Sequence, residues 1–217
     1  MIKNILNFFY KKNKKHNNYF LKDNLKNEIK ENFCNVGRWS YGNPKIYRWD
    51  FKSKLIIGNF CSLGPEIKIY LGGNHRTDWL TTFPFPANQF LKNFDKAKKI
   101  KNFHHSRGNI RIGNDVWIGG HSIILSGSLI GDGCVIGAGS LVTGKLDPYC
   151  IYAGNPIKKI RNRFRKAIIK KIIQTNWWNL DDQIINDISK YLCSNNYKAF
   201  FKIIKKINQD HGLNGKK

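Results

Sequence analysis

An aliphatic residue recurs at every sixth position along the middle of the chain. The series is Ile112, Ile118, Ile124, Ile130, Ile136 and Val142. The residue after most of its members is glycine. Neither the 3.6-residue period of an α-helix nor the two-residue period of an isolated strand produces this register. A chain wound into stacked triangular coils does, because each short face turns one aliphatic side chain into a shared interior. The repeat therefore predicts a parallel β-helix.

A second inward position follows each aliphatic residue by four places. It is occupied by small residues, namely Val116, Ser122, Ser128, Cys134 and Ser140. The same register appears earlier at Ile57, Leu63 and Ile69, and a looser copy begins at Val36. We therefore expect a mainly β chain with about four to five coils.

The repeat is interrupted between residues 71 and 109. Long loops in a compact solenoid usually carry binding or catalysis, so this excursion is the expected place for a site. Its first part is rich in aromatic residues and proline, and residues 96–101 are strongly basic. Its apolar side chains must be buried against something, and a neighbouring copy of the chain is available in a trimer.

Both ends of the chain differ from the repeat. Residues 1–32 form a basic amphipathic segment, for which a short helix on a neighbouring subunit or a frayed end is expected more than peripheral contact with an anionic membrane. Residues 33–160 form the β-helix domain. Residues 161–217 show helical spacing, and we expect an α-helical cap that hides the unpaired edge of the last coil.

Charge and cysteine content limit the possible partners. Thirty-eight Lys and Arg against 14 Asp and Glu give a net charge of +24. The positive residues are spread along the chain, which favours a phosphorylated cofactor over nucleic acid. The five cysteines show no paired spacing, so neither disulfides nor a metal site is expected, and a reducing cytoplasm fits. No apolar run approaches the length of a membrane span.

Several segments resemble one family. They are residues 57–65 (IGNFCSLGP), 72–79 (GGNHRTDW), 82–85 (TFPF), 112–119 (IGNDVWIG) and 152–156 (YAGNP). Together they resemble the xenobiotic acetyltransferase group of hexapeptide-repeat acyltransferases, which includes chloramphenicol and streptogramin acetyltransferases. The resemblance covers about residues 33–205. It implies a left-handed β-helix, a homotrimer and acetyl-CoA as cosubstrate.

Acetyl transfer needs a base for the proton of the acceptor, and His75 is the candidate. It stands at the root of the excursion, and an imidazole with a pKa near neutral suits this step. Asp78 is expected either to orient the imidazole or contact the substrate, or to stabilise a turn. His121 and the pair His104 and His105 are the alternative bases.

The remaining site residues follow from the resemblance, in which CoA lies in a groove between neighbouring prisms. This implies cofactor contacts at two corners and at nearby basic residues: Trp117, Gly119, Ala138, Gly139, Ser140, Lys145, Lys158, Lys159 and Arg161. The acceptor is expected beside residues of the excursion: Asp78, Trp79, Phe83 and Phe85.

The sequence thus predicts an acetyl-CoA-dependent O-acetyltransferase that acts without a metal on a small hydroxyl acceptor, with a sugar or glycan precursor favoured. Three alternatives remain open. They are N-acetylation of an amino sugar, possibly nucleotide-linked, O-acetylation of an antibiotic, and a non-catalytic solenoid scaffold.

Overall fold

The computed structural model describes residues 20–87, 93–101, 103 and 106–210. The chain divides into two compact units, Met1–Arg163 and Phe164–Lys217. The first 19 residues, which include most of the basic amphipathic segment, lie outside the described part.

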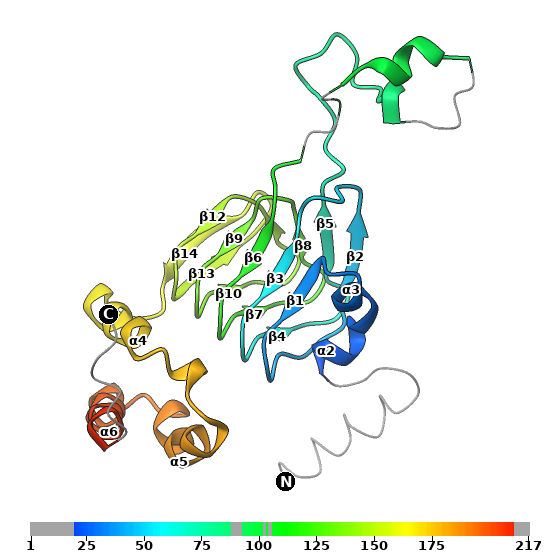
Figure 1. Ribbon diagram of the computed structural model, residues 1–217. Helices are drawn as coiled ribbons and strands as arrows, with labels where there is room; N and C mark the ends of the chain where they lie inside the picture. The colour runs from blue at the N-terminus through cyan, green and yellow to red at the C-terminus, as the bar shows by residue number, and fades with distance from the viewer. Residues whose placement is uncertain (1–19, 88–92, 102, 104–105, 211–217) are drawn as a thin grey trace. The chain divides into compact units, whose positions relative to one another are not determined.

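Three sheets of short parallel strands make up the first unit (Figure 1). The first sheet contains β1 (Cys34–Val36), β3 (Leu55–Ile57), β6 (Ile110–Ile112), β9 (Leu129–Ile130) and β12 (Lys145–Leu146). The second contains β4 (Ser62–Leu63), β7 (Trp117–Ile118), β10 (Val135–Ile136), β13 (Cys150–Ala153) and β14 (Lys158–Asn162). The third contains β2 (Lys45–Arg48), β5 (Lys68–Leu71), β8 (Ile123–Ile124) and β11 (Leu141–Val142).

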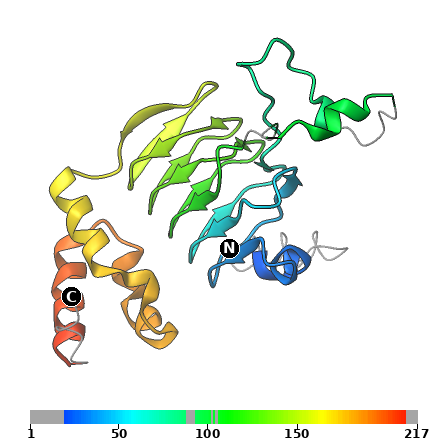
Figure 2. The ribbon, with the colours of Figure 1, turned by 45° about the horizontal axis from the view of Figure 1, so that its top comes forward.

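The chain visits the three sheets in turn, so that each visit to all three is one coil. Strands of successive coils lie side by side (Figure 2). Three coils, from β3 to β11, have a strand in every sheet. The first coil has β1 and β2 and only an isolated bridge from Tyr41 to Ser62 beside the second sheet, and β12 and β13 begin a fifth coil. The prediction of a mainly β chain built from parallel sheets is confirmed. Only β14 runs antiparallel among these described strands, as a hairpin with β13.

The six-residue repeat forms the interior of the coils. In the first sheet Ile57 pairs with Ile112, and Ile112 pairs with Ile130, so that one aliphatic column runs across the coils. All three side chains are buried. Burial of an aliphatic side chain contributes about 1.5–3 kcal/mol, so these columns hold the stack together.

The serines and cysteines among the small inward residues bond to backbone carbonyl groups. The buried Ser122 and Ser140 hydroxyls donate to the carbonyl oxygens of Gly119 (2.7 Å) and Gly137 (2.6 Å). Burial raises the pKa of the Cys61 thiol to about 12 and that of the Cys134 thiol to about 11. Both cysteines therefore pack as small neutral groups, as the repeat predicts.

Two short helices precede the first coil, α2 (Leu21–Asn24) and α3 (Lys26–Lys30). Leu21 is buried in the core of the first unit, and its backbone amide donates to the carbonyl oxygen of Ser40 at 2.9 Å. This part of the N-terminal segment is therefore joined to the coils.

The second unit is helical. It contains α4 (Lys166–Thr175), η3 (Trp177–Asn179), α5 (Asp182–Leu192) and α6 (Tyr197–Asp210). Ile172, Trp178 and Ile188 are buried, and α5 packs against α6. In the described ranges, no helix is both long and apolar enough to cross a membrane.

Candidate active site

The excursion leaves the coils after β5 and returns at β6 (Figure 1). We call the corner between the third and first sheets the excursion corner; residues 49–53, 72–73 and 106–109 lie there. Gly72 and Gly73 both have positive φ, +83° and +81°. A Cβ atom on Gly72 would lie 2.7 Å from Cβ of Asp50, and one on Gly73 would lie 2.8 Å from the Trp49 ring. Only glycine fits this pair of positions.

Asp50 connects the two ends of the excursion. It packs on Gly72 where the excursion begins, and its carboxylate accepts a hydrogen bond from Ser106 where the excursion ends. Ser53 and the backbone amide of Lys52 also donate to this carboxylate. Partial burial raises the pKa of Asp50, but these hydrogen bonds together outweigh that effect and bring it to about 2.

His75 lies two residues beyond this anchor, with an exposed side chain. Its Nδ1 is 2.7 Å from the carbonyl oxygen of Thr82. Because a carbonyl oxygen can only accept, Nδ1 carries the hydrogen and donates it. The lone pair of the neutral imidazole is then on Nε2. Thr82, seven residues further along the excursion, thus sets the tautomer of His75.

Asp78 pairs with a different partner. Its Oδ1 accepts from Nε of Arg76 at 2.7 Å, and its Oδ2 accepts from the Nη2 of the same arginine. The Arg76 guanidinium lies over the Trp79 ring, 5.4 Å from its centroid. These contacts match the turn-stabilising role of Asp78 that the sequence left open.

A pocket of about 680 Å³ opens beside His75. Its walls come from the first coil, the start of the excursion and its return. Among the residues expected at the acceptor, Trp79 and Phe83 line the pocket, whereas Asp78 and Phe85 do not. Phe85 packs instead between Phe83 and Phe94, with ring centroids 4.7 and 5.0 Å away.

Sequence reasoning missed several residues of this pocket, above all Trp49 and Asp50. They come from the turn after β2, one coil before the excursion. A signal for them was present in Gly72 and Gly73, because adjacent glycines at a corner indicate bulky residues stacked on them from the neighbouring coil.

The other candidate bases are placed elsewhere or lie outside the described residues. His121 is exposed at the corner after β7 with φ +59°, and its backbone amide donates to the carbonyl oxygen of Pro65 at 2.9 Å. It does not line the pocket. His104 and His105 fall in the undescribed part of the excursion.

The expected cofactor corner lies between the second and third sheets, and we call it the glycine corner; it consists of Gly119, Gly120, Ala138 and Gly139. Gly119 has no room for a side chain, since a Cβ atom would lie 2.4 Å from the amide nitrogen of Ala138. Ala138 and Gly139 are exposed, and a Cβ atom on Gly139 would meet nothing within 4 Å. Ser140 is buried, and its hydroxyl bonds within the coils.

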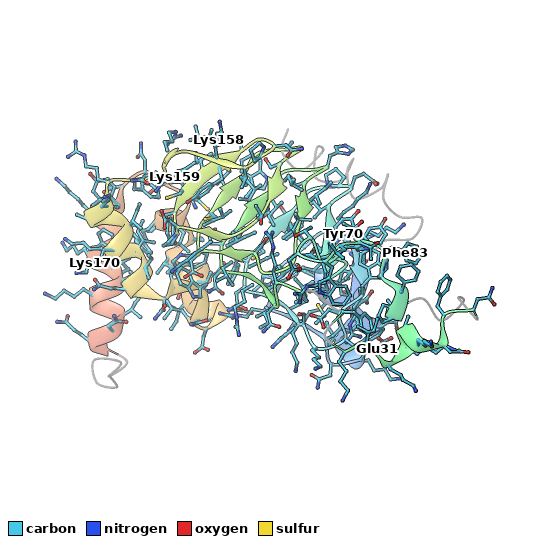
Figure 3. All side chains as sticks on the ribbon, turned by 90° about the horizontal axis from the view of Figure 1, so that it is seen from above. Glu31, Tyr70, Phe83, Lys158, Lys159 and Lys170 are labelled. Atoms are coloured by element: carbon cyan, nitrogen blue, oxygen red, sulfur yellow. The ribbon has the colours of Figure 1, made fainter. Side chains whose placement is uncertain are left out.

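The other residues expected at the cofactor fall on two sheets. Trp117 is 57% exposed on β7, and its row in the second sheet continues through Val135 and Ile151 to Arg161. Lys158 and Lys159 are on the same sheet, at the end of the stack away from Tyr70 and Phe83 (Figure 3). Lys145, on β12, belongs to the first sheet.

Lys159 already has a partner. Its Nζ lies 3.0 Å from Oδ2 of Asp147, and this hydrogen bond raises the pKa of Lys159 to about 12. Lys158 and Arg161 are exposed on either side of it in β14. Across the ranges that the structure describes, no group of three or more His, Cys, Asp or Glu residues has the arrangement of a metal site.

Comparison with known proteins agrees with this geometry. Residues 109–144 match the family model "Bacterial transferase hexapeptide (six repeats)". Chloramphenicol acetyltransferase of Klebsiella aerogenes is 37% identical over 193 residues, covering 82% of this chain and 90% of that protein. The chain belongs to the hexapeptide-repeat acetyltransferases.

Other relatives in the family act on other compounds by name. A probable macrolide acetyltransferase of Lysinibacillus sphaericus is 41% identical, over 71% of this chain and 85% of that protein. Virginiamycin A acetyltransferase of Staphylococcus aureus is 40% identical, over 70% of this chain and 73% of that protein. Family membership confirms the expected class of enzyme, an acetyltransferase, and acetyl-CoA as its cosubstrate.

Proposed function

We propose that the chain is an O-acetyltransferase in which His75 is the general base for direct attack of an acceptor hydroxyl on the thioester of acetyl-CoA. The hydrogen bond between His75 Nδ1 and the Thr82 carbonyl oxygen carries this proposal. It leaves Nε2 as the basic nitrogen of a histidine that lines a pocket at the root of the excursion.

The reaction then needs one residue to move one proton. As the acceptor oxygen attacks the thioester carbonyl carbon, Nε2 of His75 takes the hydroxyl proton. The C–O bond forms, the tetrahedral intermediate collapses, and the C–S bond breaks. The imidazolium returns its proton to the thiolate of CoA, so no acyl-enzyme forms. The Thr82 carbonyl keeps the ring oriented and accepts a stronger hydrogen bond while the imidazole is positively charged.

We place the donor along the glycine corner. Ala138 and Gly139 are exposed, and a Cβ atom on Gly139 would meet nothing within 4 Å, so a pantetheine arm can approach the backbone closely there. Trp117, Lys158 and Arg161 on the second sheet are suited to the nucleotide and its phosphates. Lys145, on the first sheet, and Lys159, which pairs with Asp147, are less suited.

The active site is completed by a second subunit in this proposal. His75 is at the excursion corner and Ala138 is at the glycine corner, and the third sheet separates these two edges of one prism. The family resemblance implies a homotrimer of left-handed β-helices. Such a trimer would bring the excursion corner of one chain to the glycine corner of the next. The exposed rings of Phe83 and Phe94 would find cover at the same contact.

The acceptor that we favour is a small sugar-like compound with a free hydroxyl. The pocket offers ring faces at Trp79 and Phe83 together with polar groups at Asn74 and Thr81. An antibiotic hydroxyl is the second candidate, because three relatives are named for antibiotics. An amino sugar would use the same base. We also propose that the chain works in the cytoplasm and that it has three parts, residues 1–32, 33–160 and 161–217.

The experiment is a CoA-release assay with separate panels of sugars, sugar nucleotides, amino sugars and antibiotics. The proposal predicts acetyl ester formation on one hydroxyl class, identified by mass spectrometry. Formation of amides alone would replace O-acetylation with N-acetylation. Absence of CoA release with every panel, in a protein that binds acetyl-CoA, would favour the scaffold alternative.

A further inference from the structure

Trp49 presents an aromatic surface that the proposed chemistry does not use. It follows β2 directly and is 48% exposed, although large apolar side chains in the coils are mostly buried. Its backbone amide donates to the carbonyl oxygen of Leu71 at 2.9 Å, which ties it to the end of β5. Its ring lines the same pocket as His75.

The indole is held in one orientation. Its plane is within 7° of the Tyr47 plane and 16° of the Tyr70 plane, with centroids 5.9 and 5.8 Å away. Gly73 lies against the ring on the excursion side, where a Cβ atom would be 2.8 Å from it. The ring is therefore positioned before any ligand arrives, and the ligand need not order it.

Gly73 also fixes where the ring lies relative to the base. The glycine that touches the indole is two residues before His75, so the turn that carries the ring packs against the segment that carries the base. Polar residues, Asp50 and Asn74 among them, line the same pocket as the ring. A flat apolar surface in a pocket with polar groups matches a pyranose, which has one face of C–H groups and a rim of hydroxyls.

We infer that Trp49 is the floor of an acceptor subsite on which a neutral pyranose ring stacks, with one of its hydroxyls directed to His75. This inference rests on the proposed O-acetylation. A nucleobase could also stack on an indole, and two guanidinium groups, those of Arg48 and Arg76, line the pocket together with the one carboxylate of Asp50. Sugar nucleotides are therefore the competing class of ligand in the test.

The test separates binding from turnover. Saturation-transfer NMR with methyl α-D-glucopyranoside and methyl β-D-galactopyranoside, without acetyl-CoA, measures stacking directly. We expect signals from the ring C–H protons with the parent protein and their loss in Trp49→Ala. Trp39→Ala is the matched control, because Trp39 is 46% exposed at a different corner, and its signals should equal those of the parent.

Kinetics give the second readout. With the pyranoside that is turned over, Trp49→Ala should raise the acceptor KM about tenfold or more, leave the acetyl-CoA KM unchanged and change kcat less than about threefold. Trp49→Leu fills the space on Gly73 without a flat ring, and it should show the same loss even if the alanine variant aggregates.

Three outcomes overturn the subsite. They are equal binding of pyranosides to Trp49→Leu and to the parent, no binding of pyranosides to the parent, and preference of the parent for sugar nucleotides. The subsite and the proposed function can fail separately. If the parent binds pyranosides, the variants do not, and no CoA is released, the subsite is supported and the proposed function is wrong. If CoA is released with a non-sugar hydroxyl compound and pyranosides do not bind, the proposed function is supported and the subsite is wrong.

Discussion

Arg163 reaches back across the coils to Asp115, with its Nη1 3.4 Å from the Oδ2 of that residue. The same nitrogen donates to the carbonyl oxygen of Gly133 at 2.7 Å. Burial raises the pKa of Asp115 to about 6, and the opposing attraction of Arg163 does not cancel this effect. The contact fastens the end of β14 to the middle of the stack.

Asp115 should make the stability of the first unit depend on pH. Its folded pKa is above its ordinary value of 3.8, so the folded chain holds the proton more tightly than the unfolded chain. The stabilisation is full below pH 3.8 and is lost as the pH rises through about 6. About a third of the side chain is exposed, so we expect the effect to be about 1–2 kcal/mol.

Asp115→Asn removes this titration. Between pH 4 and pH 7 the parent should lose about 1–2 kcal/mol of its free energy of unfolding relative to the variant, because only the parent has the Asp115 carboxyl group. Urea denaturation at both pH values measures it. A constant difference between the two proteins across this range would contradict the prediction.

His75→Ala should lower kcat by about 10²–10⁴-fold, the usual contribution of a positioned general base. Acetyl-CoA affinity should stay within error, because the donor is placed at the glycine corner. His121→Ala is the control and should retain parental turnover. His75→Asn tests the same step with a polar side chain; turnover close to that of the parent in both variants would exclude His75 as the base.

Asp50→Asn should weaken the anchor of the excursion. The amide keeps the size of the carboxylate but loses the charge that accepts from Ser53 and Ser106. We expect kcat to fall about tenfold because the His75 segment becomes less well positioned, with little change in acetyl-CoA KM. Asp95→Asn removes a charge within the excursion, away from this anchor, and should have no such effect. Equal losses in the two variants would mean that the charge matters and the anchor does not.

Two inactive variants should restore activity when mixed, if each site uses two subunits. His75→Ala lacks the base, and Ala138→Phe should block the exposed glycine corner. After mild dissociation and reassembly, some interfaces pair the intact His75 of one chain with the intact Ala138 of another. We expect up to about a quarter to a third of parental activity from mixed trimers. No recovery in assemblies shown by light scattering to be mixed would place the whole site in one chain.

Lys158→Ala combined with Arg161→Ala should raise the acetyl-CoA KM about tenfold through the loss of phosphate contacts. Lys145→Ala is the matched control, because it removes a lysine on another sheet. Inhibition by CoA and by dephospho-CoA should differ less in the double variant than in the parent. A similar KM change in the control would point to general surface charge instead.

The sequence predicted the coils well because a repeat reports directly on which side chains share the interior. Ile112 and Ile130 are separated along the chain by one full coil, yet their spacing alone places them in one column. The motif also placed His75 at the root of the excursion, where it lines the pocket. Its role as the base remains a proposal.

Contacts between coils across the excursion were not predictable in this way. Trp49 meets Gly73, and Asp50 meets Ser106, only because the register of the first coil places the turn after β2 below the root of the excursion. No periodicity links these positions. Lys145 was grouped with Lys158 for the opposite reason, because the register drifts after Val142 and conceals the change of sheet.

The excursion begins and ends at the same corner, where the Asp50 carboxylate touches both ends. For the coils, this long insertion is equivalent to an ordinary turn, so its length and sequence can vary without disturbing the aliphatic columns. Exchange of this one segment would therefore change only part of the pocket, because Trp49 and its neighbours after β2 would stay in place. A grafted excursion needs to preserve only the paired glycines at its entry and the serine at its exit.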